Sequence, residues 1–430
     1  MNKNLHGLFT SQFALLLLAC TLCTQAKAQT NKSFNDTKEA CATVLGRERA
    51  GERFGHIVNC GADILSVHPI APAAKSIVPG SGIGFGVTSK VDILKQALPN
   101  FDTTLTTNAR LSLTRFWTAD SSVLFSRKPT DGSNYGWNMK PYISRLELPH
   151  MDFYGLGGQT ALSNLVSFNE RETVGGFTGE CPIKFGTANP ITQATDFHSA
   201  LLLGGTVEFR SPRIGSVAVD HRRSIEQLFT EQTSPGILRG PDNFSHIAGS
   251  IGYRYPLLDP KGTYQLSGEA FHDFDHLGRY SFRRFEARIR QNVFRTEWFG
   301  ALDLGARMST SVATSGRRIP FYYQETLGGS NIRGEDTLRG YQDYRFRAPN
   351  VLLFQTDYAY AIPHTPLSAL LFYDAGSAEL RRRDLGRLRQ SAGFGFALRT
   401  GNRILARLYV AFGSGHGTHT FADFNSLAMQ

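Results

Sequence analysis

The feature that most constrains this chain is an alternation of apolar and polar side chains with a period of two, repeated through its C-terminal half. Residues 284–290 read RFEARIR, in which every second side chain is apolar and the others are arginine or glutamate. Residues 247–255, 393–399 and 404–413 alternate in a similar way. Because successive side chains of a β-strand point to opposite faces, each segment predicts a strand with one apolar and one polar face.

Two kinds of all-β protein show this pattern, a soluble β-sandwich and a transmembrane β-barrel. After an apolar run at residues 13–23, no window approaches the roughly 18 consecutive apolar residues of a membrane helix. Yet 11% of the residues are aromatic and 43 are glycine. A sandwich turns its polar faces to bulk water and rarely needs so much glycine. The pattern therefore favours a transmembrane antiparallel β-barrel, with lipid outside and a wet lumen inside.

The N-terminus predicts export. Lys3 precedes the apolar run FALLLLACTLC, and Ala26-Lys27-Ala28 supplies the small residues that signal peptidase needs. We expect a signal peptide over residues 1–28, removed after about Ala28. The alternative is a lipoprotein in which Cys20 is acylated. Both alternatives place the chain outside the cytoplasm, and a barrel there belongs to the outer membrane of a Gram-negative bacterium.

The remaining chain divides into a short periplasmic segment, residues 29–78, and a barrel domain, residues 79–430. In an oxidising compartment Cys41 and Cys60 are able to form a disulfide, which leaves Cys181 unpaired. Residues 80–86 read GSGIGFG, which resembles a phosphate loop, but no Gly-Lys-Ser/Thr follows. Their alternation fits the first strand of the barrel better.

Short and long connections alternate between the expected strands of the C-terminal half. The short ones are residues 258–262, 295–297, 362–366 and 400–403, and the long ones are residues 212–243, 273–278, 310–345 and 378–390. Outer-membrane barrels have short turns on the periplasmic side and longer loops outside. The asymmetry predicts an extracellular position for the long loops.

Two motifs carry a resemblance to a known family. Residues 328–341 read GGSNIRGEDTLRGY, and residues 372–376 read FYDAG. They resemble the Arg-Gly-aromatic loop and the Phe-x-Asp-x-Gly strand of the BamA/TamA, or bacterial surface antigen, type of outer-membrane assembly factor. Residues 152–157 (DFYGLG) also resemble a recurring stretch of that family. The resemblance implies a barrel of about sixteen strands with a long loop folded into the lumen.

The resemblance also implies a latch between loop and wall. Its residues are Arg339, Gly340, Tyr341, Phe372, Asp374, Gly376 and Asp357. Strand parity independently turns Phe372 and Asp374 toward the lumen, where the Arg339 guanidinium can make a charge-assisted bond to the carboxylate. Gly340 permits a close backbone approach or a positive φ. Asp357 on the neighbouring strand is a second candidate partner, and the latch either stiffens the barrel or takes part in transport.

The resemblance implies insertion or translocation of proteins or lipids. A passive or gated pore, or a structural surface protein, is the alternative, because residues 29–78 are too short for a complete periplasmic module of the family. No Ser has a matching His and acid, so we expect no enzyme and no cofactor. Residues 272–276 (HDFDH) and the pair His416 and His419 are weak metal candidates, better explained as polar turns.

We expect outer-membrane lipids and lipopolysaccharide as partners, and periplasmic or client proteins if the chain is an assembly factor. The formal net charge is +10, and a basic external loop contains Arg381, Arg382, Arg383, Arg387 and Arg389. This charge suits anionic lipid phosphates. Nothing in the sequence points to nucleic acid.

Overall fold

The computed structural model describes residues 70–424 except for 95–97, 99, 128–134, 189–194, 220–221, 238–241, 256–260, 297, 364, 401–402 and 415–416. The expected signal peptide, the lipoprotein alternative at Cys20 and the pair Cys41 and Cys60 lie outside the described residues. Cys181 is a free cysteine and is half-buried.

The described chain is almost entirely β-structure. The long strands are β2 (Gly84–Asp92), β3 (Phe101–Ser112), β4 (Trp117–Arg127), β5 (Asn138–Phe153), β6 (Val166–Ala188), β7 (Thr195–Ser216), β9 (Phe244–Tyr255), β10 (Gly262–Asp273), β11 (Phe282–Thr296), β12 (Gly300–Val312), β15 (Asn350–Ala361), β16 (Leu367–Glu379), β17 (Arg389–Thr400), β18 (Arg403–Gly413) and β19 (Gly417–Phe424). The short strands are β1 (Ile70–Ala74), β8 (Arg223–Ser224), β13 (Glu325–Leu327) and β14 (Phe346–Ala348). Four 3₁₀ turns complete the structure: η1 (Leu162–Asn164), η2 (Ile225–Gln227), η3 (Phe321–Tyr323) and η4 (Arg382–Asp384).

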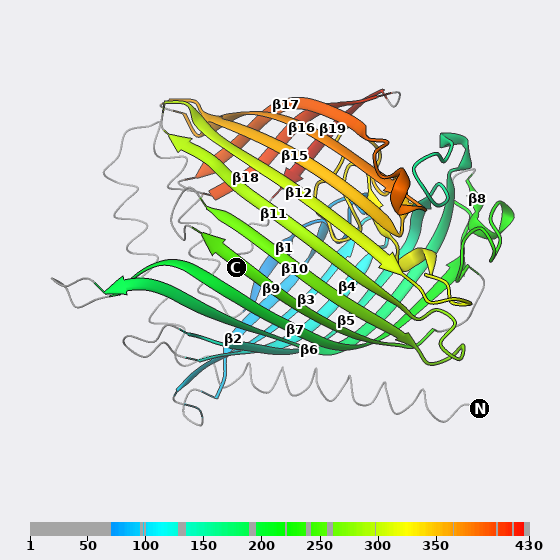
Figure 1. Ribbon diagram of the computed structural model, residues 1–430, viewed down its shortest axis with the longest axis horizontal. Coiled ribbons are helices and arrows are strands. Elements are labelled where there is room, and N and C mark those ends of the chain that lie inside the picture. The colour runs from blue at the N-terminus through cyan, green and yellow to red at the C-terminus, as the bar shows by residue number, and fades with distance from the viewer. Residues whose placement is uncertain are drawn as a thin grey trace.

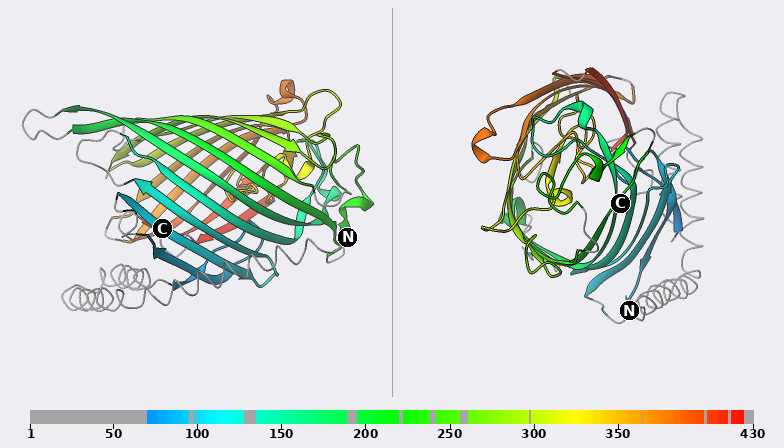
Figure 2. Two further views of the ribbon diagram at one scale, coloured as in Figure 1. Left: turned by 90° about the horizontal axis from the view of Figure 1, so that it is seen from below. Right: turned by 90° about the vertical axis from the view of Figure 1, so that its right-hand side faces the viewer.

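One sheet contains 17 of the strands. Of these, β8 adds only a two-residue parallel pairing to β6, and the other sixteen (17 − 1) pair antiparallel in chain order from β1 to β19. The sheet curls around a central axis, as the end-on view shows (Figure 2). The expected all-β antiparallel barrel of about sixteen strands is confirmed as the fold.

The two faces of the wall differ as the alternation predicts. Phe285, Leu371 and Phe394 are about half exposed on the outer face, at 57%, 54% and 50%. The inward neighbours Arg284 and Asp374 are buried, at 5% and 0%. Lipid can solvate the apolar outer face, while the inner polar groups need partners of their own.

The two ends of the barrel are unlike in its C-terminal half. The connections at 297–299, 362–366 and 401–402 are short, and those at 217–243, 274–281, 313–349 and 380–388 are longer. The paired strands β6 and β7 extend past the others at the short-turn end (Figure 1). Among the described residues no helix is both long and apolar enough to cross a membrane.

The first strand lies earlier than the sequence predicted. β1 pairs with β2 from Ile70↔Ser89 to Ala74↔Phe85, within the segment that we assigned to the periplasm. Gly80 and Gly82 have φ of +78° and +69° and belong to the turn of this hairpin. Glycine populates this region without steric cost, so the alternation at 80–83 belongs to a turn, and β2 begins at Gly84.

The long connection between β12 and β15, residues 313–349, is called the lumen loop here. It lies inside the barrel in the end-on view (Figure 2) and carries the separate hairpin of β13 and β14. Leu327, Leu338, Tyr341 and Phe346 of the loop are buried in one apolar cluster with Val351 and Leu353 of the wall. The lumen is therefore packed, on this side of the wall, by side chains that the loop brings in.

Candidate functional site

The centre of the site is the contact between the lumen loop and β16. The Arg339 side chain donates from Nε to Asp374 Oδ2 at 3.0 Å and from Nη2 to Asp374 Oδ1 at 2.6 Å. The Arg339 backbone N–H donates to the same carboxylate at 3.1 Å. Ser391 Oγ of β17 donates a further bond to it at 3.1 Å. The buried charge of Asp374 is thus satisfied by four donors, as a charge in a low-dielectric interior requires.

Two further wall residues hold the Arg339 guanidinium. Its Nη1 donates to Asp357 Oδ1 of β15 at 2.5 Å. Its Cζ atom lies 3.8 Å from the centroid of the Phe372 ring, which is within the range of a cation–π contact. The Phe372 ring occupies the space over Gly393, where an added Cβ would lie 2.4 Å from Phe372 Cζ. The structure therefore brings Arg339, Asp374, Asp357 and Phe372 into one cluster.

Gly340 allows the loop backbone to approach the wall closely, and its own backbone angles are ordinary. A Cβ there would lie 2.5 Å from Gly413 N and 2.5 Å from the Phe412 carbonyl carbon. A Cβ on Gly413 would in turn lie 2.1 Å from Gly340 O. The φ of Gly340 is not positive, so the expectation that this glycine takes a positive φ is wrong. The loop backbone lies directly on the backbone of β18.

Tyr341 and Gly376 complete the set of expected latch residues. Tyr341 Oη shares a hydrogen bond with Ser414 Oγ at 2.8 Å and donates to Gln390 O at 3.2 Å. Its ring packs edge-on against Phe346. A Cβ on Gly376 would lie 3.2 Å from Leu327 Cδ1, so this glycine makes room for the loop.

A second ionic cluster was not predicted from the sequence. Glu325 of β13 is buried. It forms an ion pair with Arg284 Nη1 at 3.0 Å and accepts a hydrogen bond from Arg333 Nη2 at 2.5 Å, and Arg307 Nη2 binds its other oxygen. Arg307 also binds Glu286 at 2.8 Å. Burial opposes ionisation, but the surrounding guanidiniums hold the pKa of Glu325 well below its usual range. Parity had turned Arg284, Glu286 and Arg288 inward, but their partners on the loop gave no sequence signal.

The C-terminal end of the lumen loop contacts the motif at residues 152–157. The Gly157 backbone N–H donates to Arg347 O at 2.7 Å. The Arg345 guanidinium lies 4.7 Å from the ring centroid of Tyr154, and the Tyr154 hydroxyl bonds Gln342. This motif, singled out from the sequence by resemblance alone, holds the other end of the loop.

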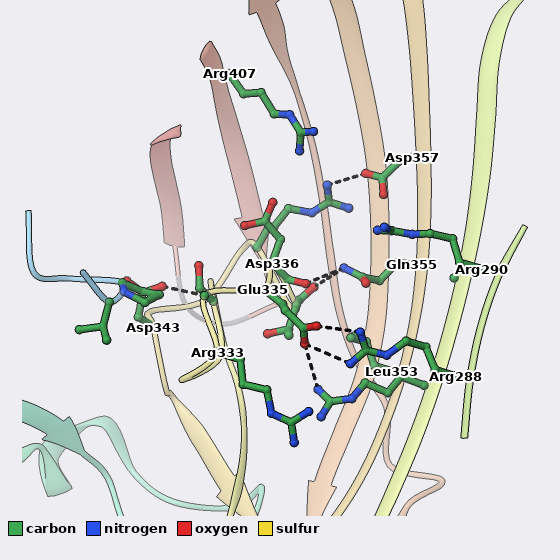
Figure 3. A pocket seen from close by; sticks show the side chains of 18 of the residues that line it. Arg288, Arg290, Arg333, Glu335, Asp336, Asp343, Leu353, Gln355, Asp357 and Arg407 are labelled. Atoms are coloured by element: carbon green, nitrogen blue, oxygen red, sulfur yellow. Dashed lines mark hydrogen bonds and ion pairs between the residues drawn. The ribbon is translucent and has the colours of Figure 1, made fainter. Parts of the chain in front are cut away.

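A cavity of about 850 Å³ adjoins the lumen loop. Its charged lining residues are Lys75, Arg110, Arg288, Arg290, Arg307, Arg333, Arg339, Arg407, Glu335, Asp336, Asp343 and Asp357. Figure 3 shows labelled side chains from the loop and from several strands directed into this space. The lining is polar and basic.

Of the weaker candidates, the turn at residues 272–276 has an ordinary structural role, and His416 of the pair His416 and His419 lies outside the described residues. Asp273 Oδ1 accepts from the backbone N–H groups of Asp275 and His276 at 3.1 and 3.3 Å, as in a capped turn. In the part of the chain described here, no group of three or more His, Cys, Asp or Glu side chains could hold a metal ion. Arg381, Arg382 and Arg383 are exposed on the β16–β17 loop.

Comparison with known proteins identifies the fold. No protein-family model matches the sequence, and no curated protein matches it. Among solved structures, BamA from Haemophilus ducreyi lacking POTRA domains 1–3 is similar over 83% of this chain and 69% of that one, with TM-score 0.52 and 12% identity. CdiB from Escherichia coli is similar over 83% of this chain and 62% of that one, with TM-score 0.50 and 11% identity. The expected BamA-type barrel is thus confirmed as the fold, and the chain spans about two thirds of the length of these relatives.

Proposed function

We propose that this protein is an outer-membrane barrel of the assembly-factor superfamily, and that it inserts or translocates proteins or lipids through the seam between its first and last strands. The observation that carries the proposal is the position of residues 341–344 of the lumen loop. Tyr341 bonds Gln390 and Ser414 at the long-loop end of β17 and β18. Three residues later, Tyr344 Oη donates to Pro79 O at 2.7 Å in the turn of the β1–β2 hairpin. Residues 341–344, called the strap here, therefore contact both sides of the seam.

Within the described residues, no register joins the first and last strands of the sheet. In this part of the chain β1 has five residues and β19 eight. Backbone groups without partners are costly in lipid, and an unpaired strand edge is a template for another strand. A seam of this kind favours pairing with a client strand once the strap is released.

A gated pore is the second candidate, and the cavity favours it. A lumen with about 850 Å³ of polar, basic space conducts ions if the lumen loop moves aside. In that case the Arg339–Asp374 contact is the closed state of a gate. The expected lipopolysaccharide contact of the exposed loop around η4 is compatible with either candidate, because it depends only on surface charge.

A reconstituted folding assay separates the two candidates. Liposomes with and without the full chain receive a urea-denatured eight-stranded barrel, and its folded fraction is followed by heat-modifiable gel mobility. The proposal expects faster client folding with the wild-type chain and a changed rate with Tyr344→Phe, which releases the strap from Pro79. Tyr253→Phe, on the outer face, is the matched control. Absence of any acceleration, together with single-channel conductance in planar bilayers, would establish the pore and overturn the insertase.

A further inference from the structure

We propose that the lumen cavity is a binding site for phosphate groups, with Arg290 of β11 and Arg407 of β18 as its principal cations. Binding of a phosphate compound in the lumen does not depend on the proposed function, which concerns the passage of client proteins or lipids at the seam. The two arginines lie next to the lumen loop.

Each arginine occupies the first inward-facing position beyond the loop on its own strand. On β11, Arg288 binds Glu335 of the loop at 2.7 Å, and Arg290 is the next inward residue toward the short-turn end. On β18, Tyr409 Oη donates to Asp336 of the loop at 3.1 Å, and Arg407 is the corresponding next residue. Both line the cavity and extend from two different walls toward the space beside Asp357 (Figure 3).

These two guanidiniums differ from those of Arg307, Arg333 and Arg339 in making no ion pair. Arg110 also lines the cavity and donates to Ser76 O at 3.5 Å. Arg307, Arg333 and Arg339 all make ion pairs within 4 Å. In the described part of the chain, Arg290 and Arg407 make no ion pair or hydrogen bond. Asp357, which also lines the cavity, already accepts a hydrogen bond from Arg339. Asp423 lies opposite Arg407 in the β18–β19 register. Eight cationic and four acidic side chains line the cavity, so its lining carries a net positive charge.

The geometry selects the chemistry of the ligand. Guanidinium forks match the paired oxygens of phosphate, and several forks converging on one space match a tetrahedral oxyanion better than a single planar carboxylate. The polar groups Thr263 and Gln265 of β10 line the same cavity and supply neutral hydrogen-bond donors. The volume of about 850 Å³ lies in the range of small-ligand pockets. The ligand class is therefore a compound with two or three phosphate groups.

Isothermal titration of the full chain in zwitterionic detergent with sodium tripolyphosphate tests the proposal. We expect one saturable site whose affinity falls as salt rises. Arg290→Gln and Arg407→Gln should each weaken binding by about tenfold, the usual worth of a charge-assisted hydrogen bond. Arg290→Lys with Arg407→Lys keeps the charge and tests the fork geometry if the glutamine variants fail to fold. Arg382→Gln, on the exposed external loop, is the control and should bind as the wild type does.

Two further arms identify the source of the phosphate. Short-chain phosphatidic acid at submicellar concentration, with short-chain phosphatidylcholine as its control, reports a lipid headgroup, and tripolyphosphate reports a soluble phosphate ester. Saturable binding of either phosphate probe that depends on Arg290 and Arg407 supports the site. Absence of saturable binding, binding unchanged in both glutamine variants, or equally tight binding of citrate would overturn it.

Discussion

Arg339 and Asp374 are joined by three hydrogen bonds, two from the guanidinium and one from the Arg339 backbone N–H. The backbone bond matters because it fixes the loop main chain, and not only a flexible side chain, to the wall of the barrel. With Asp374 fully buried and Arg339 6% exposed, each residue is the main compensation for the buried charge of the other. The latch therefore acts as a unit.

The first prediction concerns that unit. Arg339→Gln and Asp374→Asn should each lower the free energy of unfolding by about 3–5 kcal/mol, because each leaves the partner's buried charge without its main counter-ion. The double variant should cost less than the sum of the two, since it removes both buried charges of the pair and leaves only the more exposed Asp357 without Arg339. Urea unfolding of detergent-solubilised protein, followed by heat-modifiable mobility, measures the double-mutant cycle.

The control for this cycle is Arg382→Gln, which changes an exposed arginine and should leave unfolding unchanged. Additive losses in the cycle would mean that the two residues contribute separately and that the latch does not act as a unit. Planar-bilayer conductance of the same variants reports whether the loop leaves the lumen when the contact is broken.

The second prediction tests the backbone contact between loop and wall. Gly340→Ala should displace the lumen loop, because the new methyl group would lie 2.5 Å from main-chain atoms of Phe412 and Gly413. Main-chain atoms of a strand cannot rotate aside, so we expect the free energy of unfolding to fall by about 1–3 kcal/mol, as it does at other overpacked sites. Limited trypsinolysis at Arg333 and Arg339 measures the exposure of the loop.

Gly386→Ala is the matched control, since nothing lies within 4 Å of an added Cβ at that position. Equal trypsin resistance in the Gly340→Ala and Gly386→Ala variants would contradict a tight contact between the loop and β18.

The sequence predicted the wall better than the contents of the lumen. Alternation assigns Phe285 outward and Arg284 inward because the period of a strand is the same in any sheet. The same parity placed Asp374 in the lumen, where a motif supplied Arg339. The partners of Glu325 come from two strands and the loop itself, and no local pattern encodes how deeply a loop enters the lumen. Residues 80–83 alternate like a strand but form a turn, because glycine permits both conformations.

The third prediction follows from the ionic cluster around Glu325. Glu325→Gln should destabilise the seated loop by about 3–5 kcal/mol, because it removes the shared counter-ion of Arg284, Arg307 and Arg333. Urea unfolding and trypsin accessibility of Arg333 measure the effect. Glu147→Gln provides the comparison, since Glu147 pairs with Arg171, a half-exposed arginine, and such pairs are worth about 0–1 kcal/mol. Similar losses in both variants would mean that burial does not amplify the interaction.

The last prediction is a pH dependence that arises in the lumen loop. Burial, with Asp336 and Asp152 nearby, raises the pKa of Asp343 from 3.8 to about 6, although the Ser330 backbone N–H donates to its carboxylate at 2.8 Å. An acid whose pKa is raised by folding favours the folded state when it is protonated, so its contribution to the free energy of unfolding declines as the pH rises from about 4 to 6 and is constant above that range.

Asp343→Asn keeps an acceptor for Ser330 and does not ionise, and it should stabilise the loop relative to wild type at pH 7.5 but not at pH 4. Trypsin-like cleavage is itself pH-dependent, so thermal unfolding by near-UV circular dichroism is the better measurement. A difference between wild type and Asp343→Asn that stays the same from pH 4 to 7.5 would show that Asp343 is not buried in the seated loop.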